Sequence, residues 1–362
     1  MKVLLLEPWF GGSHRVCAEG YVRHSAHHVE LLTLPAQFWK WRMQGAAVSL
    51  ARMMGESALQ ADVILASGMM NVATFRALAS CRAPLALYLH QNQLTYPQNS
   101  RQRHGWQYGF VNFISALAAD RVIFNSAWHR DVFLGELPRM LRHFGDLNEE
   151  ESVQDIREKA DILAPGMDLQ QLDRLRPASP GSQMPPLILW NHRWDEDKNP
   201  SLFLDALKTL AADGVPFRVA LAGANVRRNP VEFEAARTSL GERIVQYGHV
   251  DDEETYGRLL WSADYVVSAA QQDFFGMAVV EAIYCKCIPV LPHRLNYPQL
   301  VPEGLHAQCL YRRNRLAPLL LRHLNDQFEI DADLLRAHVK RYDWKTQAPL
   351  MDRALEQLAG QA

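Results

Sequence analysis

The chain lacks several features that mark specialised classes of protein. Its 362 residues include only five cysteines, and no pair of them has C-x-x-C spacing. This disfavours a disulfide framework and a structural zinc site, and it favours a reducing compartment. No run of 18 apolar residues occurs, so we expect no membrane insertion. Neither sign of charge dominates, since 38 Lys and Arg face 40 Asp and Glu. We therefore expect a cytoplasmic enzyme or binding protein.

What is present is close to the average of soluble globular proteins. Hydrophobic residues make up 48% of the chain and charged residues 22%, which excludes a disordered, collagen-like or coiled-coil protein. A single hydrophobic core seldom serves more than about 250–300 residues. The length therefore predicts two domains.

Short apolar runs alternate with longer amphipathic stretches along the whole chain. This alternation is typical of parallel sheets built from right-handed βαβ units, so the sequence predicts an α/β fold. Helical periodicity is clearest over residues 105–118, 127–144, 201–212 and 253–262. The predicted strands are 3–6, 63–66, 85–89, 121–125, 162–164, 187–190, 217–222, 265–268 and 288–291.

One break in composition divides the chain. Residues 176–186 are rich in Pro, Gly and Ser, so neither a helix nor a strand persists there. We predict an N-terminal domain over 1–175, a linker over 176–186 and a C-terminal domain over 187–345. Residues 346–362 are predicted as a C-terminal helix, able to pack back on the N-terminal domain.

Charge is distributed less evenly than the total suggests. Residues 1–145 carry a net charge of +6 and residues 146–168 a net charge of −6. One interpretation is an ordinary solvated acidic segment that follows the first domain. The other is a basic N-terminal domain that receives an anionic partner.

The first strand ends in the sequence EPWFGGSH, residues 7–14. A glycine turn between a strand and a helix lets a ligand approach bare backbone near the helix N-terminus. The pattern is not a dinucleotide fingerprint, because Ser13 and Val16 stand where glycines are needed. This disfavours hydride transfer and leaves a plain tight turn or a ligand loop.

Polar side chains follow two of the predicted strands. His90, Gln91, Asn92 and Gln93 come directly after strand 85–89. In open α/β sheets, ligands bind at the carboxyl ends of the strands, so this group is a candidate site. Ser126 follows the next strand, where helix capping alone is enough to explain it.

Two cations follow the first strand of the second domain. Arg193 stands near its end, and Lys198 lies five residues later, just ahead of a helix. A guanidinium and an ammonium in one loop at this edge suit a diphosphate. The alternative is a surface ion pair with a neighbouring aspartate, worth at most about 1 kcal/mol.

The most specific segment is QDFFGMAVVEA, residues 272–282. Gly276 precedes a helix expected from about Met277, whose N-terminus favours a phosphate. Glu281 lies one turn along that helix and can accept hydrogen bonds from two ribose hydroxyls, while Asp273 points toward a sugar. Together these residues predict a nucleotide-sugar site.

These motifs resemble the retaining GT-B glycosyltransferases of family 4, which carry two acids separated by seven residues. The resemblance implies two Rossmann-like domains with parallel sheets facing an interdomain cleft. It implies that His90 faces the donor sugar and that Arg193, Lys198 and Asp273 complete the catalytic group. The donor-binding residues implied are Gly11, Gly12, Phe275, Gly276, Met277, Ala278 and Glu281.

The resemblance narrows to the tRNA-queuosine alpha-mannosyltransferase family. It rests on residues 34–42, 90–97, 117–120 with 124–126, 190–199 and 273–281 and spans nearly the whole chain. Three positions depart from the family pattern: Gln91 replaces a Glu, Asp273 replaces the first Glu, and Lys286 replaces a common Gly. Asp273 is one methylene shorter, which bears on sugar identity, and Gln91 removes a charge.

The family transfers mannose from GDP-mannose to the cyclopentenediol of queuosine in the anticodon of an aspartate tRNA. The resemblance implies front-face retention, in which the donor phosphate removes the acceptor proton. We expect no cofactor and no metal, because the two cations replace one, and we predict no protein partner. The acceptor-binding residues expected are Gln91, Asn92, Gln93, Arg101, Arg103 and Ser126.

Two alternatives remain open from the sequence. One is a GT-B glycosyltransferase with another nucleotide sugar and a small-molecule or lipid acceptor. The other is a non-catalytic RNA-binding protein that keeps this fold. If the acceptor is tRNA, the basic N-terminal half should contact phosphates and binding should depend on salt.

Overall fold

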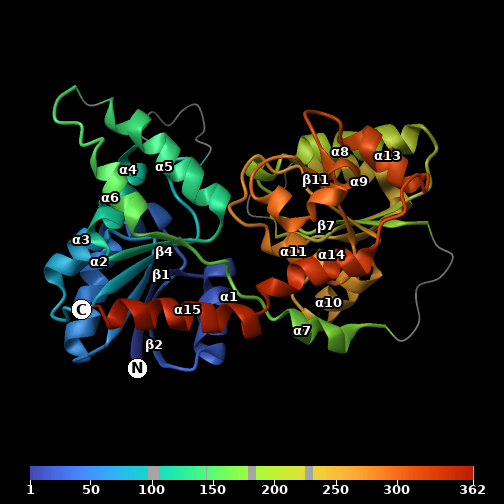
Figure 1. Ribbon diagram of the computed structural model, residues 1–362. Coiled ribbons are helices and arrows are strands. Elements are labelled where there is room, and N and C mark those ends of the chain that lie inside the picture. Colours follow the sequence, from blue (N-terminus) through green and yellow to red (C-terminus); the bar gives the residue numbers. More distant parts are fainter. Residues whose placement is uncertain (97–105, 144, 178–184, 225–230, 362) are drawn as a thin grey trace. The chain divides into compact units, whose positions relative to one another are not determined.

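The computed structural model describes residues 1–96, 106–143, 145–177, 185–224 and 231–361 (Figure 1). The chain forms two compact units, one made of Met1–Met167 with Tyr342–Ala362 and the other of Asp168–Arg341. In the described part of the chain, each unit contains one six-stranded sheet whose neighbouring strands run parallel. Among the described residues, no helix is both long enough and apolar enough to span a bilayer.

The first unit is a three-layer α/β structure. In spatial order its strands are β2 (His28–Pro35), β1 (Lys2–Phe10), β3 (Val63–Ser67), β4 (Leu85–Leu89), β5 (Arg121–Phe124) and β6 (Ala160–Ile162). Its helices are α1 (Gly12–His24), α2 (Trp39–Glu56), α3 (Val72–Leu78), α4 (Trp106–Ala118), α5 (Ala127–Leu141), α6 (Ser152–Glu158) and α15 (Trp344–Ala359).

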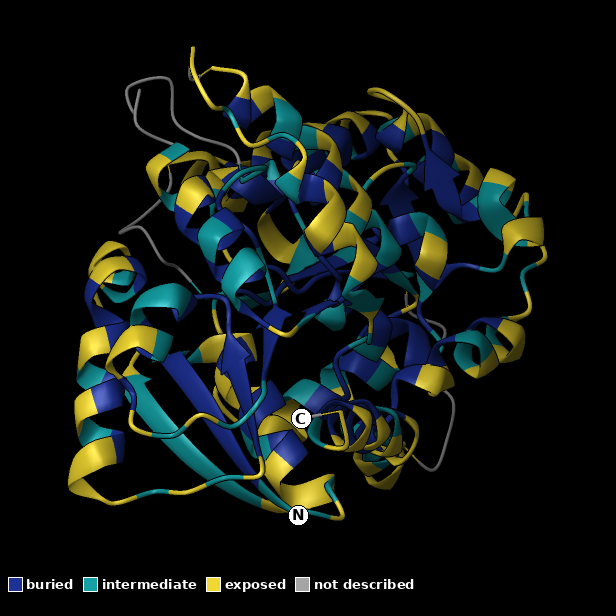
Figure 2. Cartoon of the chain, turned by 60° about the vertical axis from the view of Figure 1, so that its left-hand side comes forward, coloured by how far each residue is buried: buried dark blue, intermediate teal, exposed yellow. Residues whose placement is uncertain are grey.

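Alternate residues of these strands enter two separate cores, because successive side chains of a strand point to opposite faces. Leu4 and Leu6 pack with α2 to α5 on one face, whereas Val3 and Leu5 pack with α1 and α15 on the other. Burial on both faces explains why the central strands are continuous apolar runs. Figure 2 shows the central strands in the colour of buried residues, the edge strand β2 mainly in the colour of intermediate burial, and exposed positions on the helices.

The C-terminal helix α15 completes the second core of this unit. Trp344, Ala348 and Leu355 are buried against β1, β3 and β4. The buried carboxylate of Asp352 accepts hydrogen bonds from Tyr21 Oη at 2.7 Å and Ser25 Oγ at 2.6 Å. The last residues of the chain are therefore part of the N-terminal unit.

The second unit repeats the α/β plan. In spatial order its strands are β12 (Leu310–Tyr311), β11 (Ile288–Pro292), β10 (Tyr265–Val267), β7 (Leu187–Trp190), β8 (Arg218–Leu221) and β9 (Ile244–Tyr247). Its helices are α7 (Leu169–Leu172), α8 (Pro200–Ala212), α9 (Val231–Leu240), α10 (Glu253–Ser262), α11 (Met277–Tyr284), α12 (His306–Cys309), α13 (Leu316–Leu324) and α14 (Ala332–Val339). Helices α8, α9 and α13 cover one face of the sheet.

The boundaries of the units differ from the boundaries predicted from composition. The chain passes from the first unit to the second at Met167/Asp168, ahead of the Pro-rich segment 176–186. It returns to the first unit at Arg341/Tyr342. Contacts with α10 explain the shift, because Trp261 Nε1 donates to Leu172 O at 2.7 Å. Residues 178–184 of the predicted linker lie outside the described residues.

Each sheet has one point at which the strand order reverses direction. In the first unit this switch lies between β1 and β3, and in the second it lies between β7 and β10. The loops at the carboxyl ends of strands diverge at such a point, which leaves room for a ligand. The two switch points direct attention to residues after β1, β3, β7 and β10.

Candidate functional site

The predicted diphosphate-binding lysine is buried at the switch point of the second unit. The short 3₁₀ turn Glu196–Lys198 follows β7, and Lys198 is only 8% exposed. Its Nζ donates to Gln272 O at 2.8 Å and lies 3.4 Å from Asp273 Oδ2 and 3.6 Å from Asp197 Oδ2. The structure thus brings the predicted Lys198 and Asp273 into one ion pair.

Asp273 is held by three neighbours as well as by its loop. Its Oδ2 accepts from Tyr297 Oη at 3.1 Å, and its Oδ1 accepts from Phe275 N at 3.3 Å. Burial alone would raise the pKa of Asp273, but Lys198 above all, then His192 and the two hydrogen bonds, hold that pKa below its usual value. Asp273 is therefore a carboxylate at neutral pH.

Arg193 occupies a more open position in the same loop. Its side chain is 49% exposed and lies 3.5 Å from Asp197 Oδ2 and 3.8 Å from Asp195 Oδ2. The surface ion pair considered from the sequence is therefore present. A long, half-exposed guanidinium can still turn toward an anion, because pairs of this kind hold the side chain weakly.

His192 lies beneath these charges. It is 4% exposed, and its Nε2 has no hydrogen-bond partner in the part of the chain that the structure describes. Burial first, and then Lys198, lowers the pKa of His192 to about 4, so the imidazole is neutral. A neutral buried imidazole beside Lys198 and Asp273 is a polar group available to a ligand, which the sequence reasoning did not include.

The glycine before α11 has the conformation that the predicted phosphate site requires. Gly276 has φ +97°, and an added Cβ would lie 3.1 Å from Leu300 Cδ1 and 3.2 Å from Tyr297 Cε1. No side chain caps the helix, which begins at Met277 with Ala278 in its first turn. The loop before it is fixed because Asn296 Nδ2 donates to Phe275 O at 2.9 Å.

Glu281 lies one turn along α11 at the end of a hydrogen-bonded chain. Asn191 Nδ2 donates to Tyr256 Oη at 3.0 Å, and Tyr256 Oη donates to Glu281 Oε2 at 3.0 Å. Burial raises the pKa of Glu281 to about 7, and the hydrogen bond from Tyr256 only partly opposes that effect. Unlike the ionisation of Asp273, the ionisation of Glu281 therefore lowers the free energy of unfolding.

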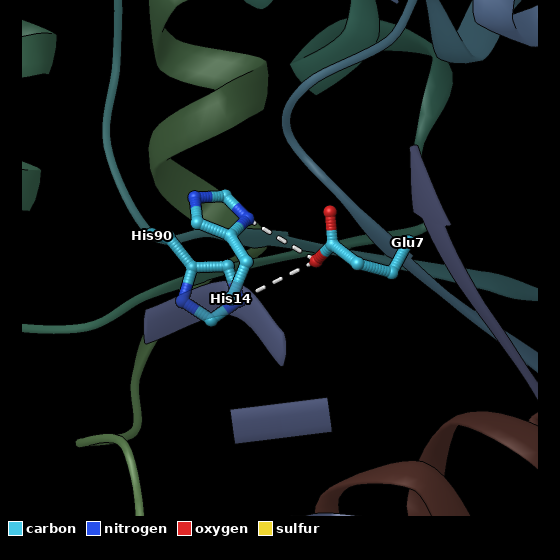
Figure 3. Close-up of side chains that lie close together, drawn as sticks. All are labelled: Glu7, His14 and His90. Carbon is cyan, nitrogen blue, oxygen red and sulfur yellow. Dashed lines mark hydrogen bonds and ion pairs between the residues drawn. The ribbon is translucent and has the colours of Figure 1, made fainter. Parts of the chain in front are cut away.

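A second polar cluster lies at the switch point of the first unit (Figure 3). Glu7 of β1 is 1% exposed, and its Oε2 lies 3.2 Å from His14 Nδ1 and 4.0 Å from His90 Nε2. Its Oε1 accepts from Ser67 Oγ, at the end of β3, and from Trp9 N, both at 2.9 Å. Predicted residue His90 thus meets two residues that the sequence reasoning assigned no role.

The histidine rings of this cluster pack against one another and against Tyr88 at inclined angles. The rings of His14 and His90 are 4.3 Å apart, and the ring of His90 is 4.6 Å from that of Tyr88. Burial, and then His14, holds the pKa of His90 well below its usual value, so His90 is neutral. Ligand atoms of Glu7, His14 and His90 lie within 4.8 Å of one another and could hold a metal ion, although the Glu7–His14 pair already explains their positions.

The glycine pair ahead of His14 shapes this loop. Gly11 is the N-cap of α1 and has extended backbone, whereas Gly12 has φ +53°. A left-handed residue at this position favours glycine, and nothing lies within 4 Å of its added Cβ. The turn brings His14, in the first turn of α1, back to Glu7.

Several predicted acceptor-binding side chains have structural partners. Asn92 is fully buried, and its Oδ1 accepts from Thr95 N at 2.8 Å. Ser126 caps α5 by accepting from His129 N, and Gln93 N donates to Asn112 Oδ1. Gln91 is partly exposed beside Met69. The predicted Arg101 and Arg103 lie outside the described residues.

Comparison with known proteins assigns both halves of the chain. Residues 2–167 match the family described as tRNA-queuosine alpha-mannosyltransferase N-terminal, and residues 173–334 match glycosyl transferases group 1. A tRNA-queuosine alpha-mannosyltransferase of Drosophila melanogaster is 32% identical over 345 residues, which covers 90% of each chain. The chain belongs to the tRNA-queuosine alpha-mannosyltransferase family. It is a glycosyltransferase, and the predicted family and enzyme class are confirmed.

More distant relatives support the same fold and class. A GDP-mannose:cellobiosyl-diphosphopolyprenol alpha-mannosyltransferase of Xanthomonas oryzae is 26% identical over 240 residues, covering 64% of this chain and 57% of the relative. Anabaena HepE, solved with UDP and glucose, superposes with a TM-score of 0.70 at 18% identity over 99% of this chain and 100% of HepE. Sucrose-phosphate synthase of Thermosynechococcus elongatus gives 0.70 at 15% identity over the whole of both chains. The predicted pair of Rossmann-like domains is confirmed.

Signals for two of the overlooked residues were present in the sequence. Glu7 is an acid in an otherwise apolar strand, and an acid buried in such a place needs partners. His14 follows the glycine turn closely enough to supply one. Tyr256 and Tyr297 gave no comparable signal, because each lies in a segment far from the acid that it contacts.

Proposed function

We propose that this glycosyltransferase moves mannose from GDP-mannose to queuosine in the anticodon of an aspartate tRNA, with retention of configuration. The observation that carries the proposal is the membership of the chain in this family. It is supported by the donor-type geometry around Lys198, Asp273 and Glu281 at the β7/β10 switch point. We assign the donor to the second unit and the acceptor to the first.

In this mechanism, departure of the diphosphate is assisted by positive charge. Lys198 is fixed and buried, Arg193 is half exposed, and the start of α11 contributes the positive end of its dipole. These groups replace a divalent metal, so we propose that none is required. Activity should then persist in excess chelator, and its loss there would contradict this part of the proposal.

The second unit also recognises the sugar and the nucleoside. In its ionised form, Glu281 accepts hydrogen bonds from the two ribose hydroxyls, and Asp273 faces the transferred sugar. The contacts of Asp273 with Lys198, Tyr297 and Phe275 fix its carboxylate. A rigid short acid selects among sugar hydroxyls by distance, which is how a site of this type distinguishes donors.

In this proposal, the first unit recognises the tRNA through its positive charge and by binding an unpaired anticodon base. The basic residues of the first unit include the exposed Arg139 and the partly exposed Arg130 on α5, which can contact tRNA phosphates. An anticodon base is unstacked before it is bound, and aromatic rings such as Trp106 can receive it. We also place the enzyme in the cytoplasm, a proposal supported by its five cysteines, none of which forms a disulfide.

The decisive experiment is mass spectrometry of queuosine-containing aspartate tRNA after incubation with the purified protein and GDP-mannose. We expect one added hexose on queuosine, and none with Lys198→Ala. UDP-glucose and a polyprenyl-linked disaccharide should be tested as the competing donor and acceptor. Transfer to the lipid alone would replace this proposal with the lipid alternative, and no transfer would refute it.

A further inference from the structure

The start of helix α2 exposes two large aromatic rings. Phe38, the N-cap residue, is 77% exposed, and Trp41, in the first turn, is 61% exposed. In the part of the chain that the structure describes, these are the most exposed of all phenylalanines and tryptophans. Large apolar groups that gather in water mark a surface for contact with another molecule.

These rings lie at the carboxyl edge of the first sheet, where the candidate site of this unit lies. The loop into α2 follows β2, and a Cβ added to Gly11 would lie 2.5 Å from Ala36 Cβ of that loop. Trp39 packs in a small cluster that contains Met69, and Met69 Sδ is 3.4 Å from Gln91 Nε2. The aromatic start of α2 is therefore continuous with the loops after β1 and β4.

Local structure fixes both rings although they are exposed. Phe38 has φ +51° and ψ +55°, a left-handed conformation that is uncommon for a phenylalanine and that gathers at ligand-binding sites. The indole of Trp41 covers Gly45 one turn later, because an added Cβ there would lie 2.7 Å from Trp41 Cζ2. One face of the indole is thus held against the helix. A ring that is already ordered loses less entropy when it binds.

The charge around the two rings has one sign. Residues 31–55 include Lys40, Arg42 and Arg52 but no acid. Lys40 Nζ lies 5.7 Å from the centre of the Trp39 ring, and Arg42 Nε donates to a backbone carbonyl of the preceding loop at 3.1 Å. Among the described residues, neither Lys40 nor Arg42 forms an ion pair with an acid. Cations without a carboxylate partner attract an anionic ligand.

Fixed rings beside unpaired cations fit one class of partner best. Unpaired RNA bases stack on aromatic side chains while Lys and Arg contact the phosphates, whereas paired bases hide their faces inside the duplex. A bilayer also attracts aromatic rings and cations, but it needs a continuous apolar face. The exposed Gln37 and Gln44 interrupt such a face here. The surface therefore fits a single-stranded loop of RNA.

We propose that Phe38 and Trp41 form a stacking platform for unpaired bases of an RNA loop, and that Lys40 and Arg42 contact its phosphates. The inference rests on the proposed function for the identity of that RNA, the anticodon loop of the acceptor tRNA. The platform takes bases beside the modified one and holds the loop at the carboxyl edge of the sheet. It takes no part in the chemical step.

The first test is fluorescence anisotropy with a labelled RNA hairpin that carries the anticodon loop of aspartate tRNA without modified bases. We expect Trp41→Leu, which keeps apolar bulk but no ring face, to raise the hairpin Kd at least tenfold. Trp41→Phe keeps a ring face and should raise it at most threefold. A fully paired duplex of the same stem should bind both variants as it binds wild type.

Leu78→Ala, at a residue of α3 that is 54% exposed, is the control for loss of an exposed apolar side chain and should leave the hairpin Kd unchanged. An unchanged Kd in Trp41→Leu would overturn the proposal. An equal rise in Trp41→Leu and Trp41→Phe would also overturn it, because stacking would then not hold the RNA.

The second test moves the rings without loss of stability. Gly45→Ala displaces the indole but favours the helix, and Phe38→Gly relieves the left-handed backbone. We expect neither variant to have a lower Tm than wild type and each to raise the hairpin Kd at least fivefold. Gly55→Ala, in the same helix with nothing within 4 Å of its added Cβ, is the control and should leave the Kd unchanged. An unchanged hairpin Kd in both test variants would refute the platform.

The salt dependence of hairpin binding tests the cations. Lys40→Gln removes one phosphate contact, so the slope of log Kd against log salt should fall by about 0.7. Lys345→Gln, at an exposed lysine of α15, is the control and should leave the slope unchanged. An unchanged slope in Lys40→Gln would contradict the phosphate contact.

The outcomes distinguish this inference from the proposed function. If wild type transfers no hexose to tRNA but binds the hairpin in a ring-dependent way, the proposed function fails and the platform stands. If Trp41→Leu keeps wild-type transfer and hairpin affinity but loses binding to phosphatidylglycerol vesicles, the surface is a membrane contact. The platform is then refuted, whereas the proposed function stands.

Discussion

At the residue scale, the two acids of the donor motif have opposite electrostatic environments. Asp273 faces Lys198, which holds the pKa of its carboxyl below the usual value, whereas the side chain of Glu281 has Tyr256 as its polar partner among the described residues. A buried carboxylate without a cation is costly in its charged form. The ionised form of Glu281 therefore needs hydrogen bonds from a ligand, whereas Asp273 is already stabilised by Lys198.

The raised pKa of Glu281 makes a prediction for stability. Its folded pKa of about 7 exceeds the ordinary value, 4.5, so folding favours the protonated form. That contribution is complete below about pH 4.5 and is lost as the pH rises through 7. Glu281→Gln keeps a neutral acceptor for Tyr256 at every pH. At pH 8 we expect the substitution to raise Tm by several degrees, which corresponds to a gain of at most about 3 kcal/mol in the free energy of unfolding. At pH 4.5 we expect Tm to be unchanged.

Thermal unfolding at these two pH values is the measurement. Glu254→Gln, at an exposed position on α10, is the control and should show no such pH dependence. An equal rise in Tm at both pH values would mean that the charge of Glu281 is not what opposes folding.

The two cations of the β7 loop should contribute differently to stability and to catalysis, and substituting each one alone tests this. Lys198→Ala leaves the buried Asp273 without its lysine, while Asp197 keeps the half-exposed Arg193. We expect a loss of about 3 kcal/mol in stability and a fall of at least 100-fold in kcat. Arg193→Ala removes a half-exposed side chain, so Tm should stay within 1–2 °C while kcat falls at least tenfold. Urea unfolding and steady-state donor turnover measure both effects.

Lys208→Ala, at a partly exposed lysine of α8 that pairs with Asp205, is the control for loss of a cation from the same unit. Donor turnover that survives both loop substitutions within tenfold would remove the diphosphate assignment.

At the element scale, the start of α11 depends on one glycine. An alanine at position 276 would have to keep φ near +97° and place its Cβ 3.1 Å from Leu300. We expect Gly276→Ala to lower the free energy of unfolding by about 1–3 kcal/mol. We also expect it to raise KM for the donor, because relaxation of the loop moves the backbone amides at the start of the helix. Urea unfolding and donor titration measure this. Gly304→Ala, with nothing within 4 Å, should be neutral in both.

Burial explains which elements could be predicted from the sequence. The central strands β3, β4 and β7 are fully buried and were predicted within a residue. The edge strands β2 and β9 are only partly buried and gave no apolar run, so both were missed. The edge strand β6 was predicted two residues too late, at 162–164 instead of Ala160–Ile162.

The candidate site was predictable where chemistry follows a strand directly. Lys198 comes from the loop after β7, and Asp273 and Glu281 come from the loop before α11 and from α11 itself. Their spacing is visible in the sequence. The partners Tyr256 and Tyr297 come from other elements, and only the fold brings them to these acids. Polar residues such as Asn92 and Ser126 looked available because the sequence does not reveal their internal hydrogen bonds.

At the scale of the whole molecule, uneven charge predicts how tRNA binding depends on salt. Residues 1–145 carry the +6 excess, while the entire chain has a net charge of −2. Even three phosphate contacts would weaken binding roughly 40-fold between 50 and 200 mM salt, because counterions are released. Fluorescence anisotropy with labelled tRNA measures the slope. GDP binding, titrated in parallel, should vary much less, and a flat slope for tRNA would contradict phosphate recognition by this unit.

The return of the chain to its first unit has a consequence for biosynthesis. Residues 168–341 form a continuous unit that can fold while the ribosome is still translating the remainder. The first unit cannot complete its core until α15 has been synthesised. Trp344 of that helix packs in the core, and Asp352 accepts a hydrogen bond from Tyr21. A nascent chain that stops near residue 340 would thus carry an intact second unit beside an unfinished first one. In the cell, premature termination late in the message would produce a fragment with a folded second unit, which proteolysis would have to remove.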